Sequence, residues 1–512
     1  MSSGPAGAVL PSAADPVVRG LTTVVGGPPG RHALLGEHRF WTPLRWLVLL
    51  TLLTSLLGWW QKSPCRVQPW EEQYQYTRGC YTDVFALYFA ERLDQGQLPY
   101  VEHPVEYPVV IGGVMTVAAS GVSVLPEDTR PRHFYDVTWA LLTACAVVVV
   151  VTSARLAGRR PWDAALFAAA PLLVLHGSTN WDLVAMALAG TGLLLWARRR
   201  PVAAGVLLGL ATATKLYPVL FLVPLLALCL RARELPAFAR TAVALVLTPV
   251  LVSLPVYLVS PTFADVGGTQ TRIAGSPLDR FADEGLAALA PHTTVPAADG
   301  APLPGVNAAY RFVALNTERP ADWDSLWFVL QEVRGEPLGS GPGTPTVLNA
   351  AVAVSFLLCL AGVVALVLRA PRRPRLPQVV FLTVLAFLLT NKVWSPQFSL
   401  WLLPLLLLAR PSWRALLAWQ AAEALVLLTR FYYFISQGSP GDGIGVDWFL
   451  SAVLLRDGVL VGVAALVVRE VLQPERDAVR VDGVDDPAGG VLDGWPDRRP
   501  PMGTSVPVRS WA

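Results

Sequence analysis

The residues best suited to chemistry gather in a polar stretch that follows the first long apolar run. Residues 61–106 are dense in Tyr, Trp, Asp and Glu. Within them, the segment from Asp83 to Leu93 places apolar side chains at helical spacing, which predicts an amphipathic helix lying at an interface. Asp83 stands at its first turn, where a carboxylate could take a proton from a reacting hydroxyl. The alternative is that Asp83 caps the helix together with Thr82.

The same stretch ends in a second polar group, formed by Glu102, His103, Glu106 and Tyr107. The pattern VEHPVEYPV predicts extended backbone, because a residue before proline is pushed out of the helical region. These side chains could bind a divalent metal or a sugar, and a hydrated loop surface is the alternative. Three tyrosines of this stretch could stack on sugar rings: Tyr81, Tyr88 and Tyr107.

Two more polar groups interrupt apolar sequence. Asn180 and Asp182 lie in HGSTNWDLVAMAL, where Asp182 could contact a sugar or acceptor, or could stabilise the first turn of a helix. Lys215 lies between two apolar halves in GLATATKLYPVLFLVPL. A lysine there is costly, so we expect it to hold a phosphate. The alternative is a side chain that extends to the membrane interface.

A polar turn, TNKVWSPQ, lies further along the chain and contains Lys392, Trp394 and Gln397. A lysine among amide and hydroxyl groups could bind an oxyanion, although a solvated turn would have the same composition. Arg430 directly follows the apolar run Trp413–Thr429 and lies away from the other basic clusters, which makes an anion site plausible there too. The chain has no Walker loop, dinucleotide fingerprint, CxxC pair or HExxH motif. We therefore expect no soluble nucleotide, no nucleic acid and no required cofactor, and we leave a divalent metal open.

The elements that must position these residues are membrane helices. The chain has 512 residues, is 53% hydrophobic and only 15% charged, whereas soluble domains are about a quarter charged. Apolar runs approach the roughly 20 residues that cross a bilayer. We predict an all-α polytopic membrane protein with about twelve spans: Thr42–Trp60, Val137–Ala154, Trp162–His176, Asp182–Ala197, Val202–Thr214, Tyr217–Leu230, Ala237–Val259, Val347–Leu368, Leu376–Thr390, Phe398–Ala409, Trp413–Thr429 and Trp448–Val468.

The positions of the basic residues orient these spans. Arginine clusters follow alternate spans, and placing all of them in the cytoplasm satisfies the positive-inside rule. The parity holds only if the Gly-rich segment Tyr107–Leu125 does not cross fully. Residues 61–106 and 260–346 then become extracytoplasmic loops of a transmembrane domain at 41–469, and residues 1–40 and 470–512 become disordered cytoplasmic tails.

Cysteine positions agree with this orientation. Cys65 and Cys80 lie together in the first outer loop, where an oxidising compartment would let them pair. Two free thiols are the alternative.

The order of the motifs resembles a known family. An acidic residue after the first span, a YP element, an NWD turn, a KLYP element and an NKVWSPQ turn occur in this order between Trp41 and Arg469. The set resembles the GT-C glycosyltransferases, specifically family 87 polyprenyl-phosphate-mannose-dependent mannosyltransferases of actinobacteria. The resemblance implies a GT-C-like fold, with Asp83 as catalytic base and Lys215 near the lipid phosphate. The chain has a single acid at the TDV position, and no motif of the family matches residues 260–346.

The expected activity follows from this resemblance and the residues. A sugar, mannose by the resemblance, would pass from a polyprenyl-phosphate donor in the bilayer to an envelope glycolipid or glycan acceptor outside the inner membrane. Asp83 would be the base of an inverting transfer, with the donor phosphate bound by Lys215, Lys392 and Arg430. Sugar or acceptor contacts would come from Tyr81, Tyr88, Glu102, His103, Glu106, Tyr107, Asn180, Asp182, Trp394 and Gln397. A transporter or flippase of lipid-linked sugars is the alternative.

The orientation can be tested by cysteine accessibility. Asp83, Asn180, Lys215 and Trp394 should lie on the outer side, so single cysteines in the exposed loops beside them should react with a membrane-impermeant reagent added outside intact cells. Cysteines at Arg199 and Arg373 should react only after the membrane is opened. Labelling of the Arg199 position from outside would overturn the orientation.

Overall fold

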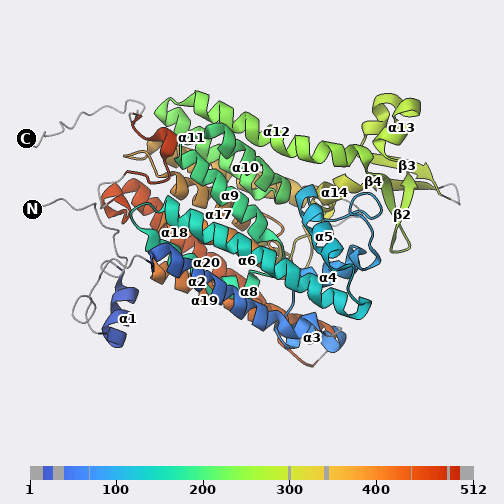
Figure 1. Cartoon of the computed structure of the whole chain (residues 1–512), viewed down its shortest axis with the longest axis horizontal. Coiled ribbons are helices and arrows are strands. Elements are labelled where there is room, and N and C mark those ends of the chain that lie inside the picture. The colour runs from blue at the N-terminus through green and yellow to red at the C-terminus, as the bar shows by residue number, and fades with distance from the viewer. Residues whose placement is uncertain are drawn as a thin grey trace, which may run out of the picture.

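A computed structural model describes residues 15–26, 40–67, 70–297, 301–338, 345–439, 441–480, 485–495 and 497 of the chain. Long helices run side by side and form a bundle with two unlike ends (Figure 1). The loop end holds the described parts of the segments 61–106 and 260–346, and the tail end holds α1 (Pro16–Gly26) and the segment 485–495. Bulky side chains fill the bundle, among them the fully buried Trp181, Trp196 and Trp419.

Among the described residues, five helices are long and apolar enough to cross a membrane. They include α2 (Pro43–Lys62), α6 (Arg130–Leu156), α12 (Leu235–Val259), α16 (Thr346–Arg369) and α20 (Val446–Leu472). Helix α19 (Trp413–Gly438) is as long, but its middle contains the polar residues Gln420, Glu423 and Arg430. The remaining apolar helices are shorter: α9 (Asp182–Ala197), α10 (Pro201–Thr214), α11 (Leu222–Ala232), α17 (Leu376–Thr390) and α18 (Leu402–Ala409).

The total of twelve spans therefore stays a prediction. Three of the predicted spans include breaks. The segment Trp162–His176 consists of η6 (Pro161–Ala164), α7 (Ala165–Ala168) and α8 (Pro171–His176), because Pro171 lacks the N–H that would continue the helix. Short 3₁₀ turns, η7 (Tyr217–Phe221) and η10 (Pro396–Trp401), likewise precede α11 and α18.

The Gly-rich segment forms a short helix, α5 (Val109–Val122), beside α6 and α10. Its 14 residues extend about 21 Å, less than the hydrocarbon core of roughly 30 Å. It lies at the loop end (Figure 1), which agrees with the expectation that it does not cross fully. Gly112 lets the Tyr100 ring approach the helix, since a Cβ there would lie 2.2 Å from that ring.

The first loop is folded against the bundle. Cys65 and Cys80, the pair expected from the sequence, form a disulfide with Cα atoms 5.5 Å apart. Helix α4 (Asp83–Ala90) begins at Asp83, Thr82 Oγ1 accepts a hydrogen bond from Val84 N, and the helix packs on α6. The other elements of this loop are η2 (Ser63–Arg66), η3 (Glu71–Gln73), α3 (Tyr74–Thr77) and η4 (Leu93–Gln95), and η5 (Glu127–Thr129) leads into α6.

The second loop contains a small sheet, so the prediction of an all-α protein was wrong in this segment. Four antiparallel strands stand in the order β2-β1-β4-β3: β1 (Thr262–Val266), β2 (Thr269–Ala274), β3 (His292–Pro296) and β4 (Pro302–Asn307). Short and largely exposed strands have little apolar alternation to reveal them. The same loop holds α13 (Pro277–Glu284), η8 (Gly285–Leu289), η9 (Ala308–Tyr310), α14 (Arg311–Glu318) and α15 (Leu326–Arg334).

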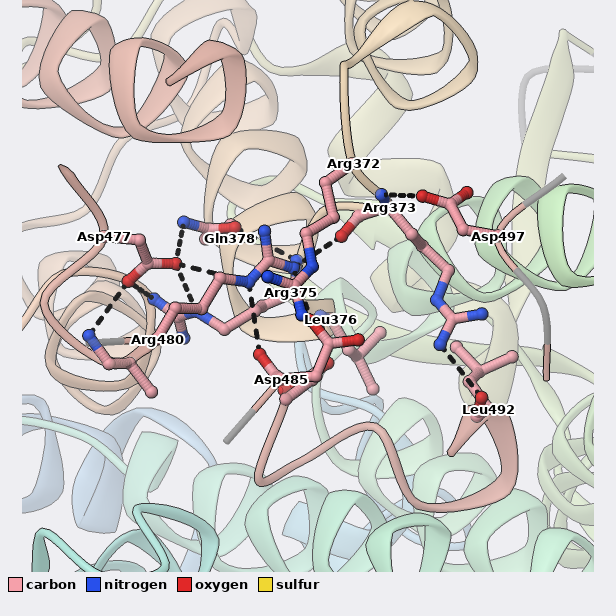
Figure 2. Close-up of polar contacts among 12 residues, drawn as sticks. Arg372, Arg373, Arg375, Leu376, Gln378, Asp477, Arg480, Asp485, Leu492 and Asp497 are labelled. Carbon is pink, nitrogen blue, oxygen red and sulfur yellow. Dashed lines mark hydrogen bonds and ion pairs between the residues drawn. The ribbon is translucent and has the colours of Figure 1, made fainter. Parts of the chain in front are cut away.

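The described part of the C-terminal tail packs on the arginine-rich end of the helices and is not disordered as expected. Figure 2 shows its aspartates facing arginines of the segment before α17. Asp497 accepts hydrogen bonds from Arg231 Nε at 2.6 Å and from the Arg373 backbone N–H at 2.6 Å. Gly490 has φ +52° and lies so close to α9 that a Cβ would be 2.4 Å from Ala197 Cα.

Arg375 is the centre of this contact. Its Nε donates to Asp477 Oδ2 at 2.7 Å, and its two terminal nitrogens donate to the carbonyls of Leu408 and Ala409 at 2.7 and 2.6 Å. Both charged side chains are 1% exposed. The Arg375 guanidinium therefore joins the start of α17, the end of α18 and the tail. The tail contains two short 3₁₀ turns, η11 (Pro474–Arg476) before Asp477 and η13 (Gly490–Leu492) after it.

The N-terminal tail also has a described part. Helix α1 (Pro16–Gly26) follows Asp15, whose Oδ2 accepts a hydrogen bond from Trp413 N at 3.1 Å. Residues 15–26 are thus structured and in contact with α19. The other residues of the predicted disordered tail before Phe40, 1–14 and 27–39, lie outside the described residues.

Removal of the Asp477 carboxylate should destabilise the fold strongly. Asp477→Ala removes the only carboxylate that accepts hydrogen bonds from the buried Arg375 guanidinium among the described residues, and the loss of such a partner typically costs about 3–5 kcal/mol. Thermal unfolding in lipid nanodiscs measures the loss. Glu336→Ala is the matched control, because the Arg334–Glu336 pair is exposed and should contribute no more than about 1 kcal/mol. Equal unfolding temperatures for the two variants would show that the tail contact is dispensable.

Candidate active site

A cavity of about 540 Å³ opens at the loop end of the bundle. Side chains from α2, the first loop, α19 and the 319–323 and 393–397 segments line it. Its polar lining consists of one group of cations, two aspartates and several neutral donors: Lys62, Tyr76, Tyr81, Asp83, His176, Thr179, Arg319, Asp322, Ser395, Gln397 and Arg430.

Asp83 is the most firmly oriented acid in this cavity. Its Oδ1 accepts a hydrogen bond from Tyr81 Oη at 2.7 Å, and its Oδ2 accepts from Asn180 Nδ2 at 2.7 Å and Gln397 Nε2 at 3.2 Å. Its backbone N–H donates to Thr179 O at 2.8 Å. The charge of Asp83, with burial, raises the pKa of Tyr81 well above its usual range, so Tyr81 remains a donor.

A second layer lies behind Asp83 and fixes the Asn180 amide. Asn180 Oδ1 accepts from Lys215 Nζ at 3.2 Å, which turns the amide nitrogen toward Asp83 and the Tyr107 hydroxyl. Lys215 also lies 3.5 Å from Asp182 Oδ2, and Trp401 Nε1 donates to Asp182 Oδ1 at 2.7 Å. The sequence-predicted Asn180, Asp182, Lys215, Tyr107 and Gln397 thus belong to one network with Asp83.

Lys215, however, does not line the cavity. Lys215 as a whole is 6% exposed. Its ammonium lies 4.9 Å from the centroid of the Tyr107 ring and is paired with Asp182. A phosphate in the cavity would meet other cations first. The geometry therefore favours a positioning role for Lys215 over the phosphate contact predicted from the sequence.

Three cations that do line the cavity are Lys62, Arg319 and Arg430. Lys62 Nζ donates to Tyr81 O at 2.7 Å, and Arg319 Nη2 pairs with Glu106 Oε2 at 2.7 Å. Of the three residues predicted to bind phosphate, only Arg430 is among them.

Arg430 is held from behind by a buried acid. Its Nη1 lies 2.9 Å from Asp324 Oδ1, and Asp324 is fully buried. The Asp324 carbonyl in turn accepts from Arg456 Nη2 at 2.6 Å. Arg456 stacks on Trp394, with its guanidinium carbon 3.7 Å from the ring centroid, so Trp394 supports this network and does not line the cavity.

The second loop supplies the cover of the cavity. Residues Arg319 to Trp323 line it, and Asp322 N donates to Lys392 O at 2.8 Å. Burial raises the pKa of Asp322 to about 6, so this acid is partly neutral near that pH. Lys392 Nζ donates to the carbonyls of Thr317 and Arg319, which makes it a support of the cover and not a lining residue.

The acidic group at the end of the first loop divides in two. Glu106 reaches the cavity indirectly through Arg319, and burial raises its pKa. His103 Nε2 lies 3.6 Å from Glu91 Oε2, and burial raises the pKa of Glu91 to about 8. Glu102 accepts from Leu98 N at 2.7 Å, which makes it a local turn contact.

Tyr88 lies in the core of the first loop, with its ring 4.7 Å from that of Phe134. It is therefore not placed to stack on a sugar in this cavity. Tyr81 and Tyr76 are the tyrosines that line this cavity.

Sequence reasoning missed Lys62, Arg319, Asp322 and Trp323. Lys62 ends an apolar run and reads as a helix terminus, although its position directly beside the acidic loop was a usable signal. The run RPADW at 319–323 has the charge and aromatic content of a binding loop, but nothing in the sequence places it over Asp83.

The arrangement can deprotonate a hydroxyl and stabilise an anion side by side. Asp83 is held by three donors, and the cations Lys62, Arg319 and Arg430 share its cavity. Such an array suits transfer of a group away from a phosphate. Among the residues that the structure describes, no group of three His, Cys, Asp or Glu side chains is placed to hold a metal ion.

Comparisons with known proteins give one family match. The model described as Glycosyltransferase family 87 matches residues 124–277, less than a third of the chain. The matched segment contains Asn180, Asp182 and Lys215 but not Asp83. No curated protein matches the sequence.

Two solved structures show a distant likeness. ArnT from Cupriavidus metallidurans bound to undecaprenyl phosphate is 14% identical, with a TM-score of 0.39, and the match covers 88% of this chain and 85% of that one. The Archaeoglobus fulgidus oligosaccharyltransferase in the apo form is 12% identical with a TM-score of 0.35, and the match covers 91% of this chain and 62% of that one. Both the identities and the TM-scores are too low for either structure to assign a substrate to this chain.

The Lys215 network makes a kinetic prediction. Lys215→Met removes one of the two donors to Asn180 Oδ1, the other being Trp181 N at 2.7 Å, and leaves Asp182 without its cation. Asp83 is then held less firmly, so the turnover of the expected sugar transfer should fall by about 10²-fold with little change in donor KM. Lys215→Arg should recover part of it. Lys392→Met is the matched control and should raise donor KM instead, because Lys392 supports the Arg319 segment. A raised donor KM with unchanged turnover for Lys215→Met would restore the phosphate-binding role.

Proposed function

We propose that this chain is a membrane glycosyltransferase that moves a sugar from a polyprenyl-phosphate donor to a hydroxyl of an extracytoplasmic glycan or glycolipid acceptor. The observation that supports this best is the shared cavity of the oriented Asp83 carboxylate and the cations Lys62, Arg319 and Arg430. The family match to residues 124–277 supports the same reaction class. Mannose as the sugar rests on the resemblance of the motifs alone.

The proposed step is a single displacement. The acceptor hydroxyl oxygen attacks the anomeric carbon of the donor sugar while its proton passes to a free lone pair of Asp83. The bond from that carbon to the phosphate oxygen breaks, and the electron pair leaves on the polyprenyl phosphate. Lys62, Arg319 and Arg430 stabilise the negative charge that develops there. The anomeric configuration inverts, because one carboxylate acts as base and no second carboxylate forms a covalent intermediate.

The location of the cavity suits a donor anchored in lipid. Lys62 is the last residue of the membrane-length helix α2, and Arg430 lies near the loop end of α19. A phosphate headgroup at the surface of the bilayer would reach both. We further propose that this surface is the outer one of the inner membrane, on the basis of the arginine-rich tail end.

Two neighbouring carboxylates have separate parts in this proposal. Glu106 holds Arg319 at 2.7 Å and so contributes to phosphate binding. Glu102 only accepts a backbone hydrogen bond within its own turn. Asp83, Glu106 and Glu102 should thus differ when each is replaced by its amide.

Purified protein in nanodiscs, supplied with labelled polyprenyl-phosphate mannose and a membrane glycolipid extract, tests the proposal. Asp83→Asn should lower turnover by about 10²–10⁴-fold at an unchanged unfolding temperature. Glu106→Gln should mainly raise donor KM, and Glu102→Gln is the matched control with near-normal rates. A folded Asp83→Asn protein with normal turnover, or a wild type that transfers no sugar from any polyprenyl-phosphate donor, would contradict the proposed function.

A further inference from the structure

A second cavity, of about 570 Å³, lies beside the first loop and takes no part in the chemistry described above. One side is formed by Arg66, Trp70, Phe85 and Phe89, and the other by the segment from Asp128 to Arg132 at the start of α6. We propose that this cavity binds a saccharide, as the subsite for the sugar chain of the acceptor. The assignment to the acceptor rests on the proposed function, whereas the saccharide site stands on the geometry below.

The two cavities share a wall. Tyr81 lines the first cavity and Trp70 lines the second, and their ring centroids are 5.3 Å apart. The Tyr81 hydroxyl donates to Asp83 on the side of the first cavity. A chain of sugars in the second cavity therefore lies one aromatic layer away from the proposed base.

Helix α4 connects the sites as well. Asp83 is its first residue, while Phe85 and Phe89, one turn apart, face the second cavity. Phe85 stacks on Trp70 with centroids 5.5 Å apart, and Phe89 lies edge-on to Phe85 at 5.5 Å. These rings form an apolar platform of the kind that can stack on the C–H face of a sugar ring.

The wall that presents this platform is built rigidly. The Trp70 indole donates to Cys65 O at 3.1 Å, and Cys65 is fixed by its disulfide to Cys80. Arg66 pairs with Asp136 and stacks on the Trp59 ring, 4.2 Å from its centroid. A preorganised aromatic surface loses less entropy on binding than a mobile one would.

The polar part of the lining favours a saccharide over a lipid chain. Arg66, Asp128, Thr129 and Arg132 place donors and acceptors around the aromatic platform. An alkyl chain would desolvate these groups without giving them partners, which costs free energy. Hydroxyl groups of a sugar could pair with both the guanidinium and the carboxylate.

The same lining does not favour a phosphate. The Arg66 charge is already neutralised by Asp136, at hydrogen-bond distance from both carboxylate oxygens. Asp128 and Arg132 add one charge of each sign to the lining, which therefore has no net positive charge. The occupant is thus a largely uncharged polyhydroxylated ligand with an apolar face.

Binding of an α-linked mannose disaccharide tests the site directly. The full-length protein is held in phosphatidylcholine nanodiscs, since the headgroup of a maltoside detergent is itself a saccharide, and saturation-transfer NMR gives the Kd. Phe89→Ala and Arg132→Ala should each weaken binding at least 10-fold, because both side chains are partly exposed and can be removed with little effect on the fold. Trp46→Ala, at the exposed surface of α2, is the matched control and should bind normally.

The remaining outcomes separate this inference from the proposed function. Asp83→Asn should bind the disaccharide as wild type does, and in transfer assays Arg132→Ala should raise acceptor KM at unchanged donor KM. Disaccharide binding that depends on Phe89 and Arg132, in a protein that transfers no sugar, would support the saccharide site and refute the proposed function. Unchanged binding and acceptor KM in both variants, or displacement of the disaccharide by octylglycerol, would overturn the saccharide site.

Discussion

The hydrogen bonds that orient Asp83 are the interaction on which the rest of the site depends. A carboxylate at the first turn of a short helix has little reason to point in one direction, yet Tyr81, Asn180 and Gln397 fix both of its oxygens. These three donors come from segments that are far apart in sequence. The packing of the first loop, the start of α9 and the turn before α18 must therefore be correct together before the Asp83 carboxylate, the proposed base, is in place.

Two networks of buried charge support the two halves of the chemistry. Lys215 and Asp182 act on Asp83 through Asn180, and Asp324 acts on the anion side through Arg430. Buried charges of this kind are costly unless they are paired, so each network also limits how far its segment can move. The membrane-length helices supply the frame, and the polar residues at their loop ends determine how the frame is used.

The helices and the order of the polar motifs could be predicted from the sequence, because membrane burial imposes long apolar runs and makes each polar residue within them conspicuous. Asn180 and Lys215 were singled out for that reason, and Gln397 because it lies in a polar turn between two apolar runs. The sheet at 262–307 and the cover at 319–323 could not be found, since neither has a regular apolar pattern and both acquire meaning only by contact with the first loop. The role of Lys215 could be predicted only in part. The cost of placing its charge in apolar sequence predicts that it has a function, but only its partners Asn180 and Asp182 distinguish positioning from phosphate binding.

The Arg375–Asp477 contact has a consequence for the order in which the chain is assembled. The two residues are 102 positions apart, and α17 and α18 lie on the N-terminal side of that interval. At a synthesis rate of about 5–20 residues per second, Asp477 is added roughly 5–20 s after Arg375. Helices α19 and α20 are synthesised in that interval, so the contact with Asp477 can form only after both have been made. A ribosome that stops shortly before residue 477 would release a chain whose active site is complete in sequence but whose opposite end is not yet locked.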